Sequence, residues 1–398
     1  MLCKYAPYLI LYFVVGYSLF SMNMGTFLII DTSENNSDLF YRTGFFVPDP
    51  VIYLEHRGEK ILVLSDLEID RGKEEATVDK VLSLSEYQKK LVSKKRKSIG
   101  LVDIADLLLK EQKIKKATVP GNFQVKYADE LRKRGYNIVS SKQEPFFEER
   151  LIKKPEEIAA LRDAVRKTAR AMDLAIRMIA SSEIRKNKLY LEGQVLTSEK
   201  VKGEINAELS RLGYTASHTI VASGAQSSLP HHTGDGPLFS DKPVIIDIFP
   251  RSQESGYFGD MTRTVIRGEP SVELIHMYNT VLKGQKIALS LVKDGAKVRD
   301  IHGAVADYFT KEGFPTGVNG GRAEGFIHST GHGLGLEIHE PPRIGFGNEV
   351  LKTGNVVTIE PGLYYKKLGG VRIEDVVVVE KSGCTNLTKY PKRFRVKV

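Results

Sequence analysis

The sequence predicts an α/β (α+β) protein of two domains, residues 24–150 and residues 151–398. Short β-branched runs alternate with segments of helical periodicity along the chain, which is typical of α/β proteins. A length of 398 residues is enough for two or three domains with sizeable cores. The composition, 41% hydrophobic and 27% charged, predicts a globular chain and excludes a disordered one.

An apolar extension, residues 1–23, precedes the first domain. Its uncharged stretch, Tyr5–Phe20, has sixteen residues, whereas a membrane span needs roughly 20. No clear small-x-small cleavage site follows it. We favour an over-long gene model that truly starts at Met22 or Met24, which predicts a cytoplasmic protein. The alternatives are a membrane anchor and an export signal, and membrane contact is expected only if this segment is real.

The first domain, residues 24–150, holds a single histidine and no cluster of potential ligands, so we assign it no chemistry. Its predicted roles are scaffold, oligomer contact or wall of an active site. The lysine-rich run Lys89–Lys97 supplies part of the net charge of +9 and is interpreted as a solvated helix face, with nucleic-acid binding the weaker interpretation. We expect strands at 26–32, 50–56, 60–66, 117–121 and 137–141, and helices at 87–97, 101–112 and 127–134.

The second domain opens with a helix, because Pro155 stands at its first position and two glutamates follow in the first turn. Apolar residues at helical spacing then predict a face that packs into the core. We expect further helices at 195–212, 271–291 and 298–312, and strands at 244–250, 257–266, 356–365 and 370–379.

Each of these four strands carries an acidic residue: Asp247, Asp260, Glu360 and Glu374. A carboxylate buried without a partner raises its pKa strongly or costs several kcal/mol. One such residue could face water at a sheet edge. Four in one domain indicate a shared counter-charge, for which one or two divalent metal ions are the simplest candidates.

Strand periodicity predicts which of these side chains meet. Asp247 and Asp260 flank a turn, so they are expected on one face of a hairpin. On the last strand, the two-residue period places Arg372 and Glu374 on one face, with Asp375 on the other as the competing ligand.

The stretch HSTGHGLGLEIHE, residues 328–340, contains His328, His332 and His339 among three glycines. Each glycine disfavours a helix by about 1 kcal/mol relative to alanine. A helix is therefore improbable, and a backbone this open can approach a ligand closely. The alternative is a turn with a few buried histidines, which three of the chain's nine histidines within thirteen residues disfavour.

Carboxylates with a histidine form an oxygen-rich set that favours manganese, cobalt, iron or catalytic zinc. Two ions that share bridging carboxylates would hold a hydroxide, which is a nucleophile at neutral pH, and would polarise a carbonyl. The sequence contains no HExxH, GxSxG or P-loop motif. Cys3 and Cys384 lie far apart and outside any CxxC pattern. The residues therefore predict metal-assisted hydrolysis.

The motifs DIFP…GDMTRT, HSTGHGLGLEIHE, IEPGLYY and VRIEDVVVV together resemble the pita-bread metallopeptidases, the group of methionine aminopeptidase, aminopeptidase P, prolidase and creatinase. The resemblance covers about Pro155–Val379, and the preceding part is similar, with weaker motifs, to a creatinase-type N-terminal domain. The resemblance implies that Asp247 binds one ion, Asp260 and Glu374 bridge two, and His332 and Glu360 bind the second, with manganese the first choice.

The same resemblance implies roles around the metals. Glu360 would also take part in proton transfer, and His231 would contact substrate or intermediate, with His232 as the alternative. His339 and Arg372 would orient the substrate and stabilise the scissile carbonyl, and His328 would line the pocket.

The implied activity is hydrolysis of an Xaa-Pro bond, in a dipeptide or at the N-terminus of a longer peptide. A homodimer is expected and nucleic acid is not. The alternatives are a methionine aminopeptidase-like enzyme, a metal-free creatine-type hydrolase and a non-catalytic binding protein on the same scaffold. One departure is the separation of Asp247 and Asp260 by thirteen positions where the family pattern has eleven. The two extra residues fit in the turn near 251–256 and leave the strand faces unchanged.

Overall fold

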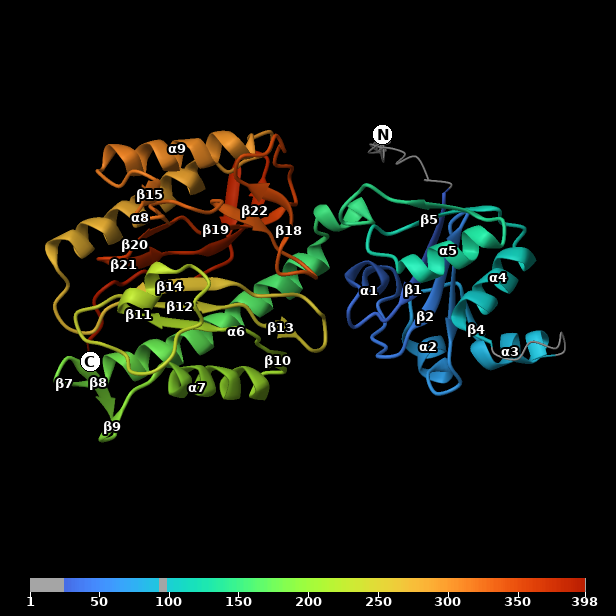
Figure 1. Ribbon diagram of the computed structural model, residues 1–398, viewed down its shortest axis with the longest axis horizontal. Coiled ribbons are helices and arrows are strands. Elements are labelled where there is room, and N and C mark those ends of the chain that lie inside the picture. Colours follow the sequence, from blue (N-terminus) through green and yellow to red (C-terminus); the bar gives the residue numbers. More distant parts are fainter. Residues whose placement is uncertain (1–24, 93–98, 398) are drawn as a thin grey trace, which may run out of the picture. The chain divides into compact units, whose positions relative to one another are not determined.

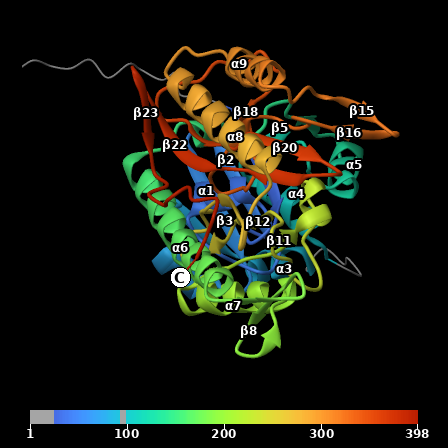
Figure 2. The same ribbon diagram turned by 90° about the vertical axis from the view of Figure 1, so that its left-hand side faces the viewer.

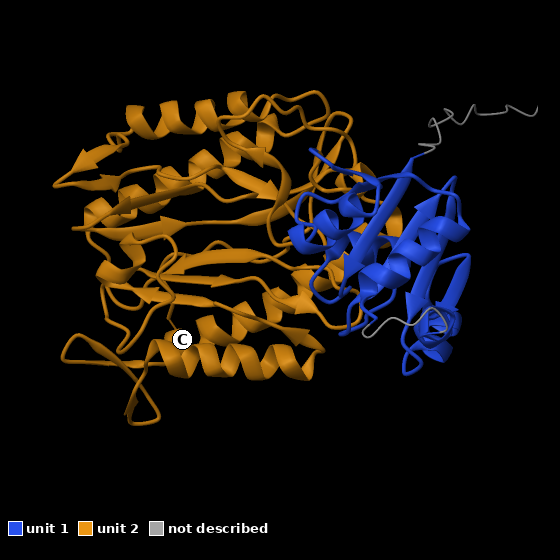
Figure 3. Cartoon of the chain, turned by 45° about the vertical axis from the view of Figure 1, so that its right-hand side comes forward, with its two compact units in different colours: residues 1–142 blue, residues 143–398 orange. Residues whose placement is uncertain are grey.

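The computed structural model describes residues 25–92 and 99–397. The apolar extension and the lysines of 93–97 lie outside these residues. Two compact units, Met1–Lys142 and Gln143–Val398, divide the chain (Figure 3). Within the described ranges, none of the helices combines the length and the apolar character that crossing a membrane requires.

Unit 1 is built on one six-stranded mixed sheet, ordered β4-β3-β2-β1-β5-β6 (Figure 1). Its strands are β1 (Thr26–Asp31), β2 (Val51–His56), β3 (Glu59–Leu64), β4 (Lys80–Ser83), β5 (Lys116–Val119) and β6 (Asn137–Ser140). Its helices are α1 (Ser37–Thr43), α2 (Ile69–Glu75), α3 (Leu84–Val92), α4 (Leu101–Glu111) and α5 (Val125–Lys133). The apolar faces of α3, α4 and α5 pack with the sheet into one core. The predicted strands and helices are present, and β4, α1 and α2 are additions to them.

Unit 2 contains the remaining elements. Its helices are η1 (Glu148–Leu151), α6 (Pro155–Ala180), α7 (Ser198–Arg211), η2 (Gly224–Ser228), α8 (Val272–Leu291) and α9 (Val298–Lys311). Its first strands are β7 (Glu183–Arg185), β8 (Lys188–Leu191), β9 (Gln194–Val195), β10 (Tyr214–Thr215), β11 (Ile220–Ser223), β12 (Val244–Ile248), β13 (Arg251–Ser252) and β14 (Met261–Val265). The later strands are β15 (Gly317–Asn319), β16 (Arg322–Glu324), β17 (Gly331–Gly333), β18 (Glu340–Ile344), β19 (Val356–Ile359), β20 (Gly362–Tyr365), β21 (Gly369–Arg372), β22 (Asp375–Glu380) and β23 (Gly383–Asn386).

Two sheets form the middle layer of unit 2: β11-β12-β14 and β18-β17-β19-β22-β23, with the ribbon β20-β21 beside them. Figures 1 and 2 show α8 and α9 on one side of this layer and α6 and α7 on the other. One apolar core of unit 2 joins α8 and α9 to β19, β21 and β22. Helix α6 starts as predicted, with Pro155 in its first turn and the Glu157 carboxylate accepting a 2.8 Å hydrogen bond from the Lys154 N–H.

Several boundaries differ from the sequence prediction. The predicted strand 356–365 is two strands, β19 and β20, and the predicted strand 370–379 is β21 and β22, which belong to different sheets. The strand predicted from residue 257 begins only at Met261. Consequently Asp260, Glu360 and Glu374 each lie one residue outside a strand. The backbone N–H of Glu360 still donates to Thr330 and that of Glu374 to Thr262, so both residues are held at a strand end.

Candidate metal centre and active site

The hairpin β12–β14 places the first two carboxylates on one sheet face. Asp247 lies opposite Thr262 in the antiparallel register, and Asp260 precedes Thr262 by two residues. Since side chains alternate along a strand, Asp247, Thr262 and Asp260 point to the same side. The longer turn between the two strands therefore leaves the predicted arrangement intact.

The second sheet brings the other potential ligands to this face. Asp260, His332 and Glu374 offer ligand atoms that all lie within 4.8 Å of one another. His332 Nε2 is 3.7 Å from Asp260 Oδ2 and 3.3 Å from Glu360 Oε1. Asp247 lies beside this group, because Arg372 contacts both Asp247 and Thr262, and the Thr262 hydroxyl donates to Glu374.

The glycines beside His332 serve packing between strands. A Cβ on Gly331 would lie 1.9 Å from the Thr358 carbonyl oxygen, and one on Gly333 would lie 2.3 Å from the Pro341 carbonyl oxygen. The turn that was the alternative interpretation is absent at residues 331–333, which form strand β17 between β18 and β19. Close strand packing requires glycine at Gly331 and Gly333.

The carboxylates of the site are buried close together, so their negative charges repel one another. Burial raises the pKa of Asp260 and of Glu374 well above its usual value, and the neighbouring carboxylates raise it further. Burial also raises the pKa of Asp247. Burial acts in the same direction on Glu360, but the hydrogen bond and charge of His332 outweigh it and hold the Glu360 pKa at about 2.

The cluster of carboxylates around His332 is incomplete, in the sense that protein groups do not satisfy all of its buried oxygens. Arg372 Nη2 donates to Asp247 Oδ2 at 2.7 Å, whereas Asp247 Oδ1 is buried with no hydrogen-bond partner among the described residues. An unpartnered buried carboxylate oxygen next to further carboxylates and an imidazole is a donor set that suits a hard or borderline divalent cation. The residues present therefore fit a divalent metal.

Arg372 connects the carboxylates to His328 through a tyrosine that the sequence analysis missed. The hydroxyl of Tyr364 accepts a 2.7 Å hydrogen bond from Arg372 Nη1 and lies 2.9 Å from His328 Nε2. Burial lowers the pKa of His328 to about 4, so its ring is neutral at pH 7. The only sequence signal for Tyr364 is its position shortly after Glu360.

Two threonines on the same faces were also missed. Thr262 Oγ1 donates to Glu374 Oε2 at 2.7 Å, and Thr358 Oγ1 lies 3.3 Å from Glu360 Oε1 while it accepts the His332 N–H at 3.1 Å. Both threonines share a strand face with a carboxylate two residues away, and this two-residue period could have identified them.

Three further histidines were predicted at the site: His339, His231 and His232. His339 is exposed and packs edge-on against His332 with ring centroids 4.4 Å apart. Burial and the charge of His332 lower the His339 pKa to about 4. His231 is exposed, and it follows directly on Pro230, whose carbonyl oxygen accepts a 3.3 Å hydrogen bond from Arg372 Nη1. His232 instead accepts a 3.0 Å hydrogen bond from the Gly234 N–H of its own loop.

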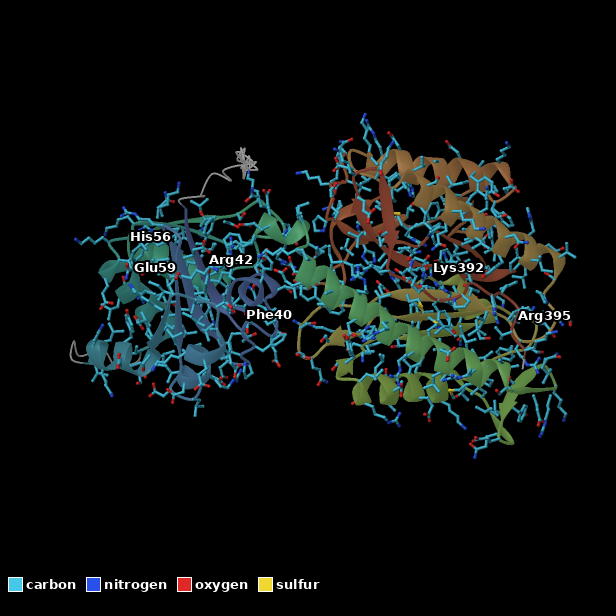
Figure 4. The ribbon with its side chains drawn as sticks, turned by 180° about the vertical axis from the view of Figure 1, so that it is seen from behind. Phe40, Arg42, His56, Glu59, Lys392 and Arg395 are labelled. Atoms are coloured by element: carbon cyan, nitrogen blue, oxygen red, sulfur yellow. The ribbon has the colours of Figure 1, made fainter. Side chains whose placement is uncertain are left out.

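Asp375, the competing ligand, is engaged elsewhere. Arg263 Nη2 donates to its Oδ1 at 3.0 Å, and Lys392 and Asn386 contact its Oδ2. Lys392 comes from the C-terminal segment, where Figure 4 labels it. The charge of Asp375 is thus balanced by Arg263 and Lys392, whereas its neighbour Glu374 lies among other carboxylates.

The chain is similar to proteins of known class. Residues 159–381 match the model of metallopeptidase family M24. An Xaa-Pro dipeptidase from Pyrococcus furiosus is 36% identical over 242 residues, which are 60% of this chain and 64% of that protein. An Xaa-Pro dipeptidase from Pyrococcus horikoshii is 31% identical over 334 residues, 82% of this chain and 83% of that protein. The match to the first relative therefore spans slightly less than two thirds of its length.

A solved structure resembles the chain over nearly its whole length. The X-Pro aminopeptidase from Thermotoga maritima superposes with a TM-score of 0.77 and 25% identity, covering 94% of this chain and 98% of that one. The likeness therefore includes both units and extends beyond the segment matched by the family model.

Proposed function

Since this chain belongs to metallopeptidase family M24, we propose that it is a divalent-metal-dependent peptidase that hydrolyses Xaa-Pro bonds. The family and the pita-bread fold predicted from the sequence are confirmed by the family match and by the likeness to the Thermotoga enzyme. The names of the two Pyrococcus relatives support a substrate with proline at its second position.

The observation that carries the proposal is the incomplete carboxylate cluster. Four buried or half-buried acidic residues converge with His332, and one buried oxygen of Asp247 has no hydrogen-bond partner in the described part of the chain. A non-catalytic scaffold has no use for carboxylates that repel one another, whereas a metal-dependent hydrolase requires such carboxylates as ligands.

The ligands of the metal would be Asp247, Asp260, His332, Glu360 and Glu374. We propose two ions, with manganese as the first choice and cobalt, zinc or iron as alternatives. When bound, such ions polarise the scissile carbonyl and make water a nucleophile at neutral pH.

The other side chains would bind the substrate and move protons. Glu360, ionised at neutral pH, would accept a proton at a carboxylate oxygen and return it to the leaving prolyl nitrogen. His339 and His231 would hydrogen-bond the scissile region, and His339 would do so as a neutral imidazole. Arg372 would orient the substrate from its place between Asp247 and Tyr364. His328 would line the pocket, with His232 as the alternative contact to His231.

The test is hydrolysis by the purified, manganese-loaded chain of an Xaa-Pro dipeptide beside an Xaa-Pro-Xaa tripeptide. Cleavage of the dipeptide alone identifies a dipeptidase, and cleavage of the tripeptide identifies an aminopeptidase P-like enzyme. A methionyl peptide without proline serves as the control, because its cleavage would favour the methionine aminopeptidase alternative. Cleavage of none of them by a metal-loaded chain would overturn the proposal in favour of a non-catalytic scaffold.

Three further expectations stay predictions. These are a homodimer, the absence of nucleic-acid binding and a cytoplasmic location. Size-exclusion chromatography with light scattering measures the first directly.

A further inference from the structure

We propose that Arg322 is a positioning residue for this reaction: it fixes the C-terminal end of η2 and thereby the short segment that leads to His231. The proposal rests on the peptidase function proposed above. Arg322 lies on β16, in a hairpin that the sequence analysis did not predict.

The contact is made by the Arg322 guanidinium. Its Nη2 donates to the carbonyl oxygen of Ser228, the last residue of η2, and lies 2.9 Å from the Ser228 hydroxyl. Carbonyls at the end of a helix lack helical donors, and a cation satisfies them well. Hydrogen bonds from a charged donor are roughly twice as strong as neutral ones. Ser228 is buried, which shields this contact from water.

The opposite side of η2 is fixed by β21. A Cβ on Gly370 would lie 2.0 Å from the Ser227 carbonyl oxygen, and the Gly370 N–H donates to Ser227 Oγ at 2.9 Å. Two residues beyond Gly370 on the same strand, Arg372 Nη1 donates to the Pro230 carbonyl at 3.3 Å. The segment 228–230 is therefore held by one arginine at each end.

His231 depends on this support. Its side chain is exposed, and among the described residues its ring makes no hydrogen bond. It stands three residues after Ser228 and directly after Pro230, whose carbonyl oxygen accepts the hydrogen bond from Arg372. With no bond of its own, the ring is placed by the backbone that precedes it.

The hairpin that carries Arg322 is hydrogen-bonded to strand β20 and to the residue that follows it. Gly325 and Tyr364 exchange two backbone hydrogen bonds, at 2.9 and 3.1 Å, and the Lys366 N–H donates to Glu324 Oε1 at 2.8 Å. Tyr364 is the residue that bonds both Arg372 and His328. Arg322 thus links the His231 loop to the same strand that holds the substrate-side groups.

The test is a double-mutant cycle on hydrolysis of an Xaa-Pro dipeptide. We expect Arg322→Ala to lower kcat/KM about 10- to 100-fold with unchanged bound manganese and thermal midpoint, and Arg322→Lys to recover part of the loss. In a His231→Ala background, Arg322→Ala should cause no further loss, since both changes remove the same interaction. Arg185→Ala, on an exposed arginine paired with Glu183, is the matched control and should change nothing.

Equal losses from Arg322→Ala with and without His231 would overturn the proposal, as would loss of bound metal in Arg322→Ala. Amide hydrogen exchange of residues 226–232 gives a readout without turnover. Faster exchange in Arg322→Ala than in Arg185→Ala is expected, and equal exchange would overturn the positioning role. If the wild-type chain cleaves no Xaa-Pro peptide, the proposed function fails, and the exchange experiment still decides whether Arg322 holds this loop.

Discussion

Asp106 in unit 1 and Asp260 in unit 2 are buried to a similar depth, with 2% and 4% of their surfaces exposed. Lys110 Nζ and the Tyr136 hydroxyl each donate to the Asp106 carboxylate at 2.8 Å, and Arg134 lies 3.7 Å away. The neighbours of Asp260 are His332 and three more carboxylates. The exposed fractions of the two residues are therefore similar, whereas the supply of positive partners differs.

The two environments move the pKa in opposite directions. Burial acts to raise the pKa of Asp106, but the hydrogen bonds from Lys110 and Tyr136 outweigh it and lower the pKa. Burial and the neighbouring carboxylates raise the pKa of Asp260. A buried carboxylate whose partners are donors and positive charges of the protein has a structural role. A buried carboxylate without such partners requires a bound ligand to balance its charge.

His56 of unit 1 and His332 of unit 2 differ in their surroundings in the same way as the two aspartates. His56, labelled in unit 1 in Figure 4, lies with Nδ1 2.7 Å from Thr26 Oγ1, at the ends of the two central strands β2 and β1. His332 in unit 2 lies between Asp260 and Glu360. The same side chain is thus a local strand contact in one unit and a member of a charged cluster in the other.

The largest effect is expected from Asp260→Asn. The substitution removes one charge that a bridging ligand needs while it keeps the side-chain volume, so activity should fall about a thousandfold or more. Steady-state hydrolysis of an Xaa-Pro dipeptide measures this, and circular dichroism checks that the fold is intact. Full activity in a folded variant would mean that the incomplete cluster is not the catalytic centre.

A smaller loss is expected from His339→Ala. Its ring contacts His332 but lies outside the group of ligand atoms, so the variant should keep its metal and lose about 100-fold in turnover. Metal analysis and kcat on one preparation separate the two properties. Loss of metal together with activity would place His339 among the ligands.

The smallest effect on activity is expected from Asp106→Asn in unit 1. The substitution weakens the bonds to Lys110, Tyr136 and Arg134, so unit 1 should lose about 1.5–3 kcal/mol of stability while activity per folded molecule stays unchanged. Since folding lowers the Asp106 pKa, its stabilisation is present above about pH 4 and is lost as the pH falls through the folded-state pKa.

Amide exchange of residues 101–111 between pH 7 and about pH 2 measures this contribution, because this range includes the lowered pKa of folded Asp106. The wild type should approach the variant as the pH falls. A constant difference between the two across this range would contradict the assigned role of Asp106.

The sequence predicted a candidate metal site because potential ligands show in residue type. Asp247, Asp260, Glu360 and Glu374 stand out as acids within β-branched runs, and His332 stands out among glycines. The two-residue period correctly placed Asp247 and Asp260 on one face. The two-residue period also favoured Glu374 over Asp375, and the resemblance to a known family supplied what the residues alone left open, such as which carboxylates would bridge two ions.

Strand ends and tertiary contacts could not be predicted in the same way. The breaks after Glu360 and before Glu374 depend on which sheet each half joins, and that is decided by partners far away in the sequence. The bond between Tyr364 and Arg372, and the hold of Arg322 on Ser228, are likewise visible only after folding.

Manganese binding by equilibrium dialysis tests the contrast between the two units most directly, on the wild type and on the pair Asp106→Asn and Asp260→Asn. The expected result is equal binding by the wild type and Asp106→Asn, and clearly reduced binding by Asp260→Asn. Absence of binding by the wild type, or equal binding by all three proteins, would contradict the claim that the carboxylates of unit 2 are completed by metal.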